Sequence, residues 1–296
     1  MATLEETVYR PPIENKSALL EIALGCSYGK CTFCQYSNNE TPLQLISSEM
    51  LSENLDELVS QGEMSERMFL LGGNVLAFKT RYLLDIFRFI QSYLPNITQF
   101  CMYARADDVA HKTDAQLAAL RDAGLRTLYI GVESGNLQIL RMCRKGETPE
   151  EIIQALHRLD GIGIQYGLSS ILGLGGEELW RQNALDTAAL FNQVRPASIR
   201  VMTLTPMPGT PLAADIETGK FQKPQPRTIL KEELLLLENL RCTEDSPFLF
   251  SGSHLSNAVP LSGVLPAERE RLLLGLRDAL ATKSEKDLAV PPPLRW

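Results

Sequence analysis

The sequence predicts an α/β protein whose core is a partial (β/α)6, TIM-like barrel followed by a C-terminal helical extension. Two observations predict this fold. Short apolar runs alternate six times with amphipathic stretches between residues 18 and 212, and these runs lead into loops rich in glycine, cysteine or proline. Strand–helix units in series imply a parallel sheet with right-handed crossovers. An open doubly wound sheet is the alternative arrangement.

The first three strand–helix units are expected between residues 18 and 123. Their apolar runs predict buried strands, and stretches with one apolar face predict helices. Ser47 suits the N-cap of the first helix, Pro95 follows the end of the second, and Gly124 ends the third. The expected strands are residues 18–24, 68–71 and 99–103, and the expected helices are residues 47–62, 80–93 and 113–123.

The last three units are expected between residues 128 and 204. Each of their strands ends in an unusual loop, which is ESG after the fourth strand, GLGG after the fifth and TPMPGTP after the sixth. The expected strands are residues 128–132, 164–172 and 198–204, and the expected helices are residues 149–159 and 177–194.

Four segments organise the chain in this prediction. Residues 1–17 lead into the core, residues 18–212 form the barrel, and residues 213–283 form an extension that covers it. Residues 284–296 are polar and rich in proline, which predicts a flexible tail. Within the extension, residues 220–227 (KFQKPQPR) predict a linker, and residues 228–241 and 266–281 predict helices.

The composition is typical of a globular protein, and we expect it in the cytoplasm. Apolar residues make up 44% of the chain and charged residues 22%. The formal net charge is −7, so no nucleic-acid partner is expected, because such partners require a basic surface. No apolar run is long enough to cross a membrane, and the first residues do not form a signal peptide.

Three of the six cysteines lie in one short stretch, GCSYGKCTFCQ, which contains Cys26, Cys31 and Cys34. A closed zinc site requires four protein ligands, whereas three thiolates on a four-iron cluster leave one iron open to an outside ligand. The open cluster is the preferred interpretation, and a metal staple completed by a distant residue is the alternative. The remaining cysteines are expected to be small buried side chains; they are Cys101, Cys143 and Cys242.

The other unusual loops also follow strands, and ligands bind at the carboxyl ends of parallel strands. Gly72 and Gly73 leave the backbone approachable after the second strand, although a tight turn would need the same residues. Glu133 ends a buried strand, so its carboxylate must face something polar. It could accept hydrogen bonds from ribose hydroxyls or pair with a lysine or arginine. Phe33 could shield a cluster or serve only loop packing.

These features together resemble the radical S-adenosylmethionine (radical SAM) superfamily. The likeness covers about residues 18–210 and rests on the three cysteines, the aromatic residue before the third, the GG pair, the ESG turn and the glycine in strand five. The stretches YRPP, LGCSYGKCTFC, YIGVESG, ILGLGG and TPMPGTPL are similar to short members without a cobalamin domain. The resemblance implies two cofactors, a [4Fe-4S] cluster and S-adenosylmethionine.

The resemblance also implies roles for individual residues. Cys26, Cys31 and Cys34 would each bind one iron, and the open iron would chelate the amino and carboxylate groups of S-adenosylmethionine. Gly72 and Gly73 would meet the methionyl amino group. The other implied cofactor contacts are Phe33 beside the cluster, Glu133 and Ser134 of the ESG turn at the ribose, and Leu172 with Gly173 beside adenine.

An electron donor such as flavodoxin or ferredoxin would then drive reductive cleavage to methionine and a 5'-deoxyadenosyl radical, which abstracts hydrogen from an unidentified small-molecule substrate. A tetrapyrrole- or haem-related radical SAM enzyme is one alternative. A non-catalytic iron–sulfur electron-transfer or metal-binding protein is another.

The sequence departs from the superfamily pattern at two positions. The first two cysteines are separated by four residues (CxxxxCxxC) where three are usual, which leaves the orientation of S-adenosylmethionine and the bond that breaks open. Asn74 stands where many members have a glutamate, so recognition of the methionyl ammonium would depend more on backbone carbonyls.

Three further residues are candidates for the substrate side. Tyr103 and Arg105 end the third strand and could reach the barrel lumen, where Arg105 could pair with a carboxylate of cofactor or substrate. A salt bridge from Arg105 to Asp107 or Asp108 is the alternative. His254 could contact substrate or move a proton if the extension folds over the barrel mouth, and a surface or capping histidine is its alternative.

Overall fold

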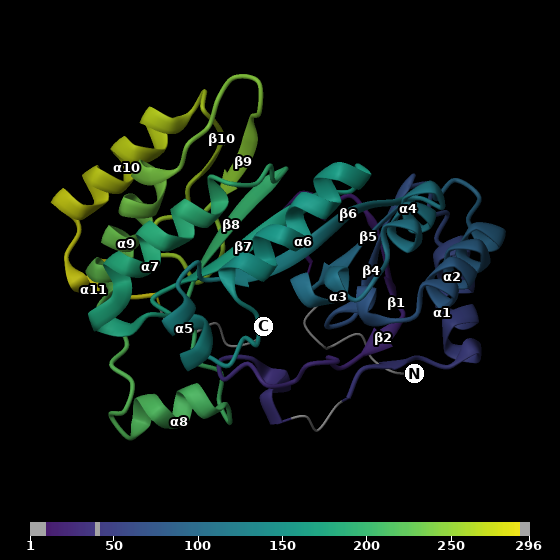
Figure 1. The fold of residues 1–296 in the computed structure, drawn as a ribbon, viewed down its shortest axis with the longest axis horizontal. Coiled ribbons are helices and arrows are strands. Elements are labelled where there is room, and N and C mark those ends of the chain that lie inside the picture. Colours follow the sequence, from purple (N-terminus) through teal and green to yellow (C-terminus); the bar gives the residue numbers. More distant parts are fainter. Residues whose placement is uncertain (1–9, 39–41, 291–296) are drawn as a thin grey trace.

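One eight-stranded sheet organises the chain in the computed structural model, which describes residues 10–38 and 42–290 (Figure 1). Neighbouring strands from β1 through β9 run parallel, and β10 runs antiparallel to β9. A separate small sheet pairs β2 (Ala23–Leu24) with β3 (Gln44–Leu45). In spatial order the large sheet contains β1 (Ala18–Glu21), β4 (Arg67–Leu71), β5 (Gln99–Ala104), β6 (Leu125–Glu133), β7 (Gln165–Leu172), β8 (Ser198–Thr203), β9 (Phe248–Ser251) and β10 (Ser262–Leu265).

Helices follow the parallel strands and pack along one face of the sheet (Figure 1). Three 3-10 helices lie in loops: η1 (Pro12–Glu14), η2 (Gln35–Asn38) and η3 (Val75–Ala77). The α-helices are α1 (Ser48–Ser60), α2 (Thr80–Tyr93), α3 (Ala106–Ala110), α4 (Asp114–Asp122), α5 (Leu137–Met142), α6 (Pro149–Ile162), α7 (Gly176–Phe191), α8 (Pro211–Glu217), α9 (Pro226–Asn239), α10 (Arg269–Thr282) and α11 (Glu285–Leu288).

The predicted α/β fold with a parallel sheet is confirmed. Strands β1 and β10 stand at the two ends of the sheet and do not pair with each other in the described residues, as expected of a partial barrel. Local signals set the helix ends: the Ser47 hydroxyl accepts a hydrogen bond from the Met50 N–H at the start of α1. Thr148 and Glu151 form a capping box at the start of α6, and Gly163 ends α6 with φ of 83°.

The two faces of the sheet differ in what covers them. Side chains such as Met102, Leu128 and Ile199 point toward the helices and form the main core. We call the opposite side the inner face; it carries a separate cluster with Phe69 and Tyr129 at its centre. Side chains of this face further along the strands are only half-buried, so they can meet a ligand.

A buried ion pair fills the inner face near the amino ends of the strands. Glu14 of η1 accepts hydrogen bonds from Arg67 on β4 at 2.6 and 2.8 Å, and it also contacts Ser17 and Tyr129. Burial opposes ionisation of Glu14, but these hydrogen bonds outweigh it and lower its pKa to about 2. This end is therefore occupied by protein, and the opposite end is left for a ligand.

The C-terminal extension differs from the expected helical cover. Strands β9 and β10 continue the sheet beyond β8, while α9 and α10 pack on its helical face. These short strands were missed because runs of only four residues give little periodicity. The main-chain groups at the free edge of β8 need hydrogen-bond partners, and β9 supplies them.

Two smaller expectations also change. The strand expected at residues 18–24 is interrupted at Ile22, so β1 pairs with β4 and β2 pairs with β3. The segment expected to be a flexible tail begins with α11, whose Leu288 is 1% exposed in the core. The remainder of that tail, at residues 291–296, lies outside the described residues, as does the start of the lead-in, at residues 1–9.

Candidate cofactor site

The three cysteines of the GCSYGKCTFCQ loop lie beyond β2, on the side of the carboxyl ends of the strands. Cys26, Cys31 and Cys34 carry free thiols and are half-buried. Burial is the main cause that raises the pKa of the Cys34 thiol to about 11, and the charges of Cys31 and Cys26 contribute to this increase. The loop thus gathers three soft sulfur donors in one place.

Backbone hydrogen bonds fix this cysteine loop to three other segments. The Thr32 N–H donates to the Cys143 carbonyl at 2.9 Å, and the Leu212 N–H donates to the Thr32 carbonyl at 3.0 Å. The Gly73 N–H donates to the Gly25 carbonyl at 3.0 Å. The fold therefore positions the loop through its main chain, independently of the thiols.

The Gly72-Gly73 pair allows the loop after β4 to approach the cysteine loop. A Cβ on Gly73 would lie 2.3 Å from the Gly25 carbonyl oxygen, a distance that no side chain tolerates. Gly72 has φ of 155°, and a Cβ there would lie 2.8 Å from a methyl group of Val75. Close packing thus explains why both are glycines, and contact with the methionyl group stays a prediction.

Asn74 connects the cysteine loop to the start of α3. Its Oδ1 accepts a hydrogen bond from the Ser27 N–H at 2.9 Å, and its Nδ2 donates to the Ser27 hydroxyl at 2.7 Å. The same Nδ2 group donates to both carboxylate oxygens of Asp108, at 3.1 and 3.0 Å. Burial raises the pKa of Asp108 to about 6. Asn74 is thus engaged at both ends of its amide.

Arg105 lies beside the cysteine loop. It forms the ion pair with Asp107 that the sequence analysis gave as the alternative, with Nε and Oδ1 2.9 Å apart. Its Nη1 is also 3.9 Å from the Cys31 sulfur, and its guanidinium lies 3.9 Å from the centre of the Tyr28 ring. The Arg105 side chain therefore faces the expected cluster ligands as well as Asp107.

Lys145 is a second buried cation at this site, and the sequence analysis missed it. Its side chain is 4% exposed, and its Nζ lies 3.3 Å from Glu147 and 3.9 Å from Glu133. Burial raises the pKa of the Cys31 thiol, and the charges of Lys145 and Arg105 oppose that increase. Nothing in the RKGE stretch itself distinguishes this lysine from an exposed one.

Glu133 ends β6 in a strained conformation. Its φ of 67° lies in the left-handed region, which side chains other than glycine rarely adopt. The carboxylate folds back over Gly131, where a Cβ would lie 2.1 Å from Oε1. Burial raises the pKa of Glu133, and Lys145 opposes this shift. The strain aims a carboxylate at the carboxyl edge of the sheet beside the cysteine loop.

A chain of buried hydrogen bonds connects the ESG turn to the GLGG loop. The Ser134 hydroxyl donates to Asn183 Oδ1 at 2.5 Å, and Asn183 Nδ2 donates to Glu232 at 2.6 Å. Glu232 in turn accepts the Gly173 N–H at 2.9 Å. Asn183 on α7 and Glu232 on α9 thus fix two loops that the resemblance assigns to one cofactor.

Phe33 and Leu172 lie on different sides of the sheet edge. Phe33 is half-buried and packs on an apolar cluster that includes Ile139, Ile171 and Leu212. Leu172 is 2% exposed within the main core, so only its backbone can meet a ligand at the site.

Tyr103 and Arg200 meet on the inner face, and His254 lies near Arg200. The Tyr103 ring packs edge-on against Phe69, with ring centres 5.2 Å apart. Arg200 of β8, which the sequence analysis missed, interacts with the Tyr103 phenol. Burial raises the pKa of Tyr103 to about 12 and lowers that of His254 to about 4, and the charge of Arg200 also contributes to the His254 shift.

The donor set fits an iron–sulfur cluster better than a single ion. In residues 10–38 and 42–290, no three histidine, cysteine or acidic side chains converge closely enough to share one metal ion. A four-iron cluster does not need such convergence, because each thiolate binds a different iron. Three thiols in one loop therefore fit a four-iron cluster that keeps one iron open.

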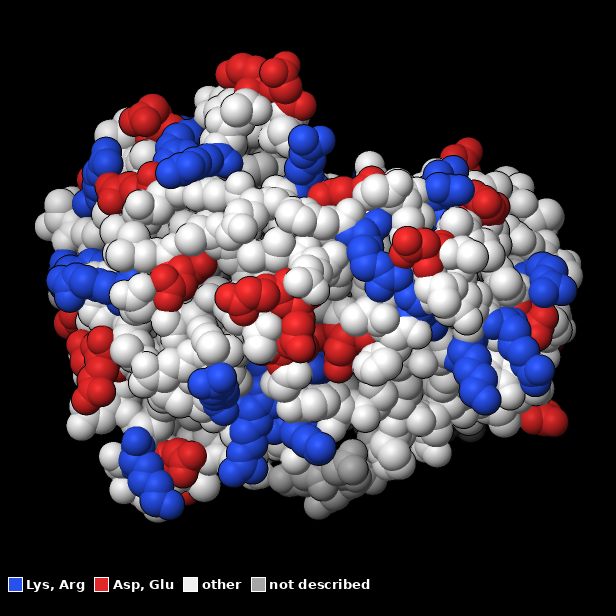
Figure 2. All heavy atoms as spheres, in the orientation of Figure 1, with Lys and Arg blue, Asp and Glu red and all other residues white. Residues whose placement is uncertain are grey.

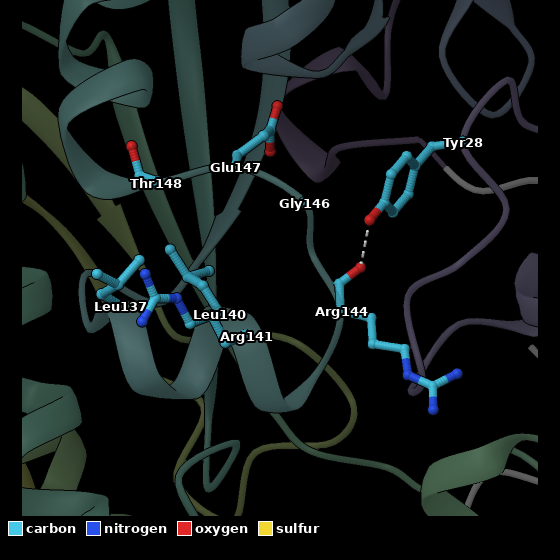
Figure 3. A pocket seen from close by; sticks show the side chains of 8 residues that line it. All are labelled: Tyr28, Leu137, Leu140, Arg141, Arg144, Gly146, Glu147 and Thr148. Carbon is cyan, nitrogen blue, oxygen red and sulfur yellow. Dashed lines mark hydrogen bonds between the residues drawn. The ribbon is translucent and has the colours of Figure 1, made fainter.

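Two pockets flank the cysteine loop. In the first, of about 240 Å³, the Tyr28 hydroxyl donates to the Arg144 carbonyl at 2.8 Å (Figure 3). The second, of about 640 Å³, is lined by Tyr28 and by residues after β4 and β5. Solvent thus reaches the loop from its flanks. The first pocket is lined by Tyr28, Leu137, Leu140, Arg141, Arg144, Gly146, Glu147 and Thr148.

Charges of both signs are interspersed over the face shown in Figure 2. This distribution lacks the continuous basic stripe that binds nucleic-acid backbones. Among the described helices, none combines the length and the apolar character needed to cross a membrane.

The open parallel barrel and the three cysteines at its carboxyl edge are features of a class of cofactor-dependent α/β-barrel enzymes. Residues 20–188 match the model of the Radical SAM superfamily, which is more than half of the chain, and the chain belongs to this superfamily. The resemblance seen in the sequence is thereby confirmed. The superfamily consists of enzymes that use a [4Fe-4S] cluster and S-adenosylmethionine, so these are the cofactors of the chain.

Curated relatives are similar over part of their length. The chain is 28% identical to 4'-phospho-dehydrooxetanocin synthase of Priestia megaterium over 52% of this chain and 23% of that protein. It is 26% identical to tRNA-2-methylthio-N(6)-dimethylallyladenosine synthase of Chromohalobacter salexigens over 76% of this chain and 51% of that protein. The chain therefore spans about half the length of these relatives or less.

Solved structures share the fold. Methylornithine synthase (PylB) superposes with a TM-score of 0.54 at 16% identity, covering 76% of this chain and 63% of that one. TsrM from Kitasatospora setae, with cobalamin and a [4Fe-4S] cluster bound, superposes with a TM-score of 0.54 at 17% identity, covering 69% and 37%. At these identities the likeness supports the fold alone.

Proposed function

We propose that this radical SAM enzyme holds its cluster through Cys26, Cys31 and Cys34 and cleaves S-adenosylmethionine reductively to act on a small molecule. The observation that carries the proposal is the cysteine loop itself. Its three free thiols lie in a loop held by main-chain hydrogen bonds, and the Arg105 and Lys145 cations lie beside it.

The cofactor chemistry supplies the reactive group. A cluster held by Cys26, Cys31 and Cys34 would supply, when bound with S-adenosylmethionine, one-electron reductive cleavage to methionine and a 5'-deoxyadenosyl radical, which would take a hydrogen atom from the substrate. The protein's own residues bind and orient S-adenosylmethionine and the substrate, and they exclude water from the site.

Specific residues would orient S-adenosylmethionine. Gly72 and Gly73 would present main-chain groups to the methionyl ammonium, since both Asn74 amide groups are already bonded to Ser27 and Asp108. Glu133 would accept hydrogen bonds from ribose hydroxyls. Gly173 would lie beside adenine, and Ser134 would act through its bond to Asn183.

The chemistry requires two partners. The half-buried cysteine loop is accessible to an external electron donor such as flavodoxin or ferredoxin. We expect this enzyme and its electron donor in the cytoplasm. The proposed substrate is a small molecule, although the name of one relative indicates that it modifies tRNA. The net charge of −7 and the mixed surface charges support this choice.

The first test is anaerobic reconstitution of the full chain, followed by iron and sulfide analysis. About four irons per chain are expected. Addition of S-adenosylmethionine and dithionite should then form 5'-deoxyadenosine, measured by liquid chromatography and mass spectrometry. The variant with Cys26, Cys31 and Cys34 all changed to alanine should lose both cluster and product.

The matched control is Cys242→Ala, because Cys242 is also half-buried but lies outside the loop. It should keep the wild-type iron content and product. A cluster that survives in the triple variant would refute the ligand assignment. A cluster without any cleavage would support an electron carrier, and methylthioadenosine as the product would show that a different carbon–sulfur bond breaks.

A further inference from the structure

The half-buried Arg200 differs from Arg67 and Arg105 in having no acidic partner in the described residues. Arg67 pairs with Glu14, and Arg105 pairs with Asp107. Arg200 has no ion pair with any residue in the described part of the chain, and its Nε is buried without a hydrogen-bond partner there. A cation held away from water is costly unless an anion or several acceptors compensate it.

Strand register places Arg200 among small polar side chains on the inner face. Ser169 on β7 and Ser251 on β9 are its direct neighbours in the sheet, and Ser262 on β10 is the neighbour of Ser251. Residues in register on adjacent strands point to the same face. The Ser262 hydroxyl donates to the Ser251 hydroxyl at 3.3 Å. Hydroxyl donors thus lie on either side of the guanidinium.

Two glycines beside this row of side chains make room for neighbouring side chains. Gly131 and Gly167 occupy inner-face positions on β6 and β7, the two strands between Tyr103 on β5 and Arg200 on β8. A Cβ on Gly167 would lie only 2.8 Å from the Tyr129 ring. The Tyr103 phenol interacts with Arg200 on the same face of the sheet.

The same row continues to the cofactor site. Gly131 is in register with Ser169, which is in register with Arg200. The Glu133 carboxylate lies over Gly131. A group bound at Arg200 would therefore lie on the same face as Glu133 and at the same level of the sheet, beside the proposed ribose contact.

We propose that Arg200, with the Tyr103 hydroxyl and the flanking serines, binds an oxyanion of the substrate, either a carboxylate or a phosphate. A guanidinium with unused donors and neighbouring hydroxyls is suited to such a group. This inference rests on the proposed function, because it assigns part of the substrate to the same site.

The test measures anion binding to the reconstituted enzyme directly. Calorimetric titrations with inorganic phosphate and with succinate, at constant ionic strength set by chloride, distinguish a phosphate site from a carboxylate site. Wild-type protein should bind at least one anion, and Arg200→Gln should bind it about tenfold or more weakly. Tyr103→Phe keeps the ring packing on Phe69 and should weaken anion binding less than Arg200→Gln does.

Arg126→Gln is the matched control, because it removes the same charge from an exposed arginine on β6. It should bind the anion as the wild type does. Equal binding by Arg200→Gln and wild type, or no binding of either anion by the wild type, would overturn the inference. Weaker binding of S-adenosylmethionine by Arg200→Gln would also overturn it, because Arg200 would then serve the cofactor.

The same samples separate this inference from the proposed function. Arg200→Gln should keep wild-type iron content and should still form 5'-deoxyadenosine without substrate. If the wild type binds an anion through Arg200 but forms no cluster or no 5'-deoxyadenosine, the proposed function fails and the anion site remains. If cleavage is normal and anion binding is absent, only the anion site fails.

Discussion

Asn74 shows how one amide can replace a charged residue when its surroundings change with it. The resemblance places a glutamate here in many superfamily members, but in this chain the position faces the Asp108 carboxylate, with Asn74 Nδ2 within 3.1 Å of both oxygens. A glutamate would set two carboxylates against each other in a buried place. The neutral amide instead donates to Asp108 and fixes Ser27 of the cysteine loop.

Asn74→Asp should therefore destabilise the apoprotein in a pH-dependent way. The pKa of Asp108 is raised to about 6, so at pH 5 it is largely protonated and can donate a hydrogen bond to the new carboxylate. At pH 8 both groups would be ionised, and the loss should reach about 1–3 kcal/mol. Urea unfolding at the two pH values measures the difference; an equal effect at both would contradict the explanation.

Helix α9 carries two adjacent glutamates that are both buried, at the element that joins the extension to the core. Glu232 bonds to Gly173 and Asn183, whereas Oε1 of Glu233 has no hydrogen-bond partner in the described residues. Burial raises the pKa of each carboxyl to about 8. A pKa raised above its unfolded value favours the protonated form, so folding stability is lost as pH rises from about 4.5 to about 8.

Glu233→Gln should remove much of this loss. At pH 8 we expect the variant apoprotein to have a higher thermal midpoint than the wild type, corresponding to an unfolding free energy larger by about 2 kcal/mol. At pH 5 the midpoint should change little. Glu238→Gln, at an exposed position of the same helix, is the control and should leave the pH profile unchanged. A Glu233→Gln profile parallel to that of wild type would contradict the prediction.

Elements with strong periodicity and clear ends were predictable from the sequence, and those defined by tertiary pairing were not. The helix expected at residues 80–93 agrees with α2 because its apolar face repeats through the whole segment. Strands β9 and β10 owe their place to the free edge of β8, which no local pattern records.

The candidate site shows the same division. The cysteines and glycines were visible because their types and spacing are unusual. Lys145 and Arg200 were not, because a single cation gains its role only from what surrounds it after folding. Asn183 and Glu232 were missed for the same reason, since their hydrogen bonds join segments far apart in the chain.

In the described residues, one continuous eight-stranded sheet joins the partial barrel to the C-terminal extension. Strand β9 pairs with β8 through Ser198, Ile199 and Arg200, and α9 packs on α7 and β7. We therefore expect residues on both sides of the boundary after residue 212 to unfold as a single cooperative unit. Removing the extension would expose the edge of β8 and uncover the apolar surface that α9 buries.

A chain ending at residue 212 should accordingly fail to fold. We expect it to be insoluble, or to lack the cooperative unfolding transition that circular dichroism should show for the full chain. The full chain purified in parallel is the reference. A soluble fragment 1–212 that unfolds cooperatively and takes up iron would show that the extension is a separate domain.

Tyr28, which lies within the longer spacing between the first two cysteines, packs against residues far away in the sequence. Tyr28 lies between Cys26 and Cys31, stacks on Arg105, and bonds to the Arg144 carbonyl. A side chain at Gly146, whose φ is 75°, would start 2.2 Å from its hydroxyl. Among related chains, the inserted tyrosine and this glycine should thus be inherited together, and a chain with the shorter spacing should be free to vary at position 146.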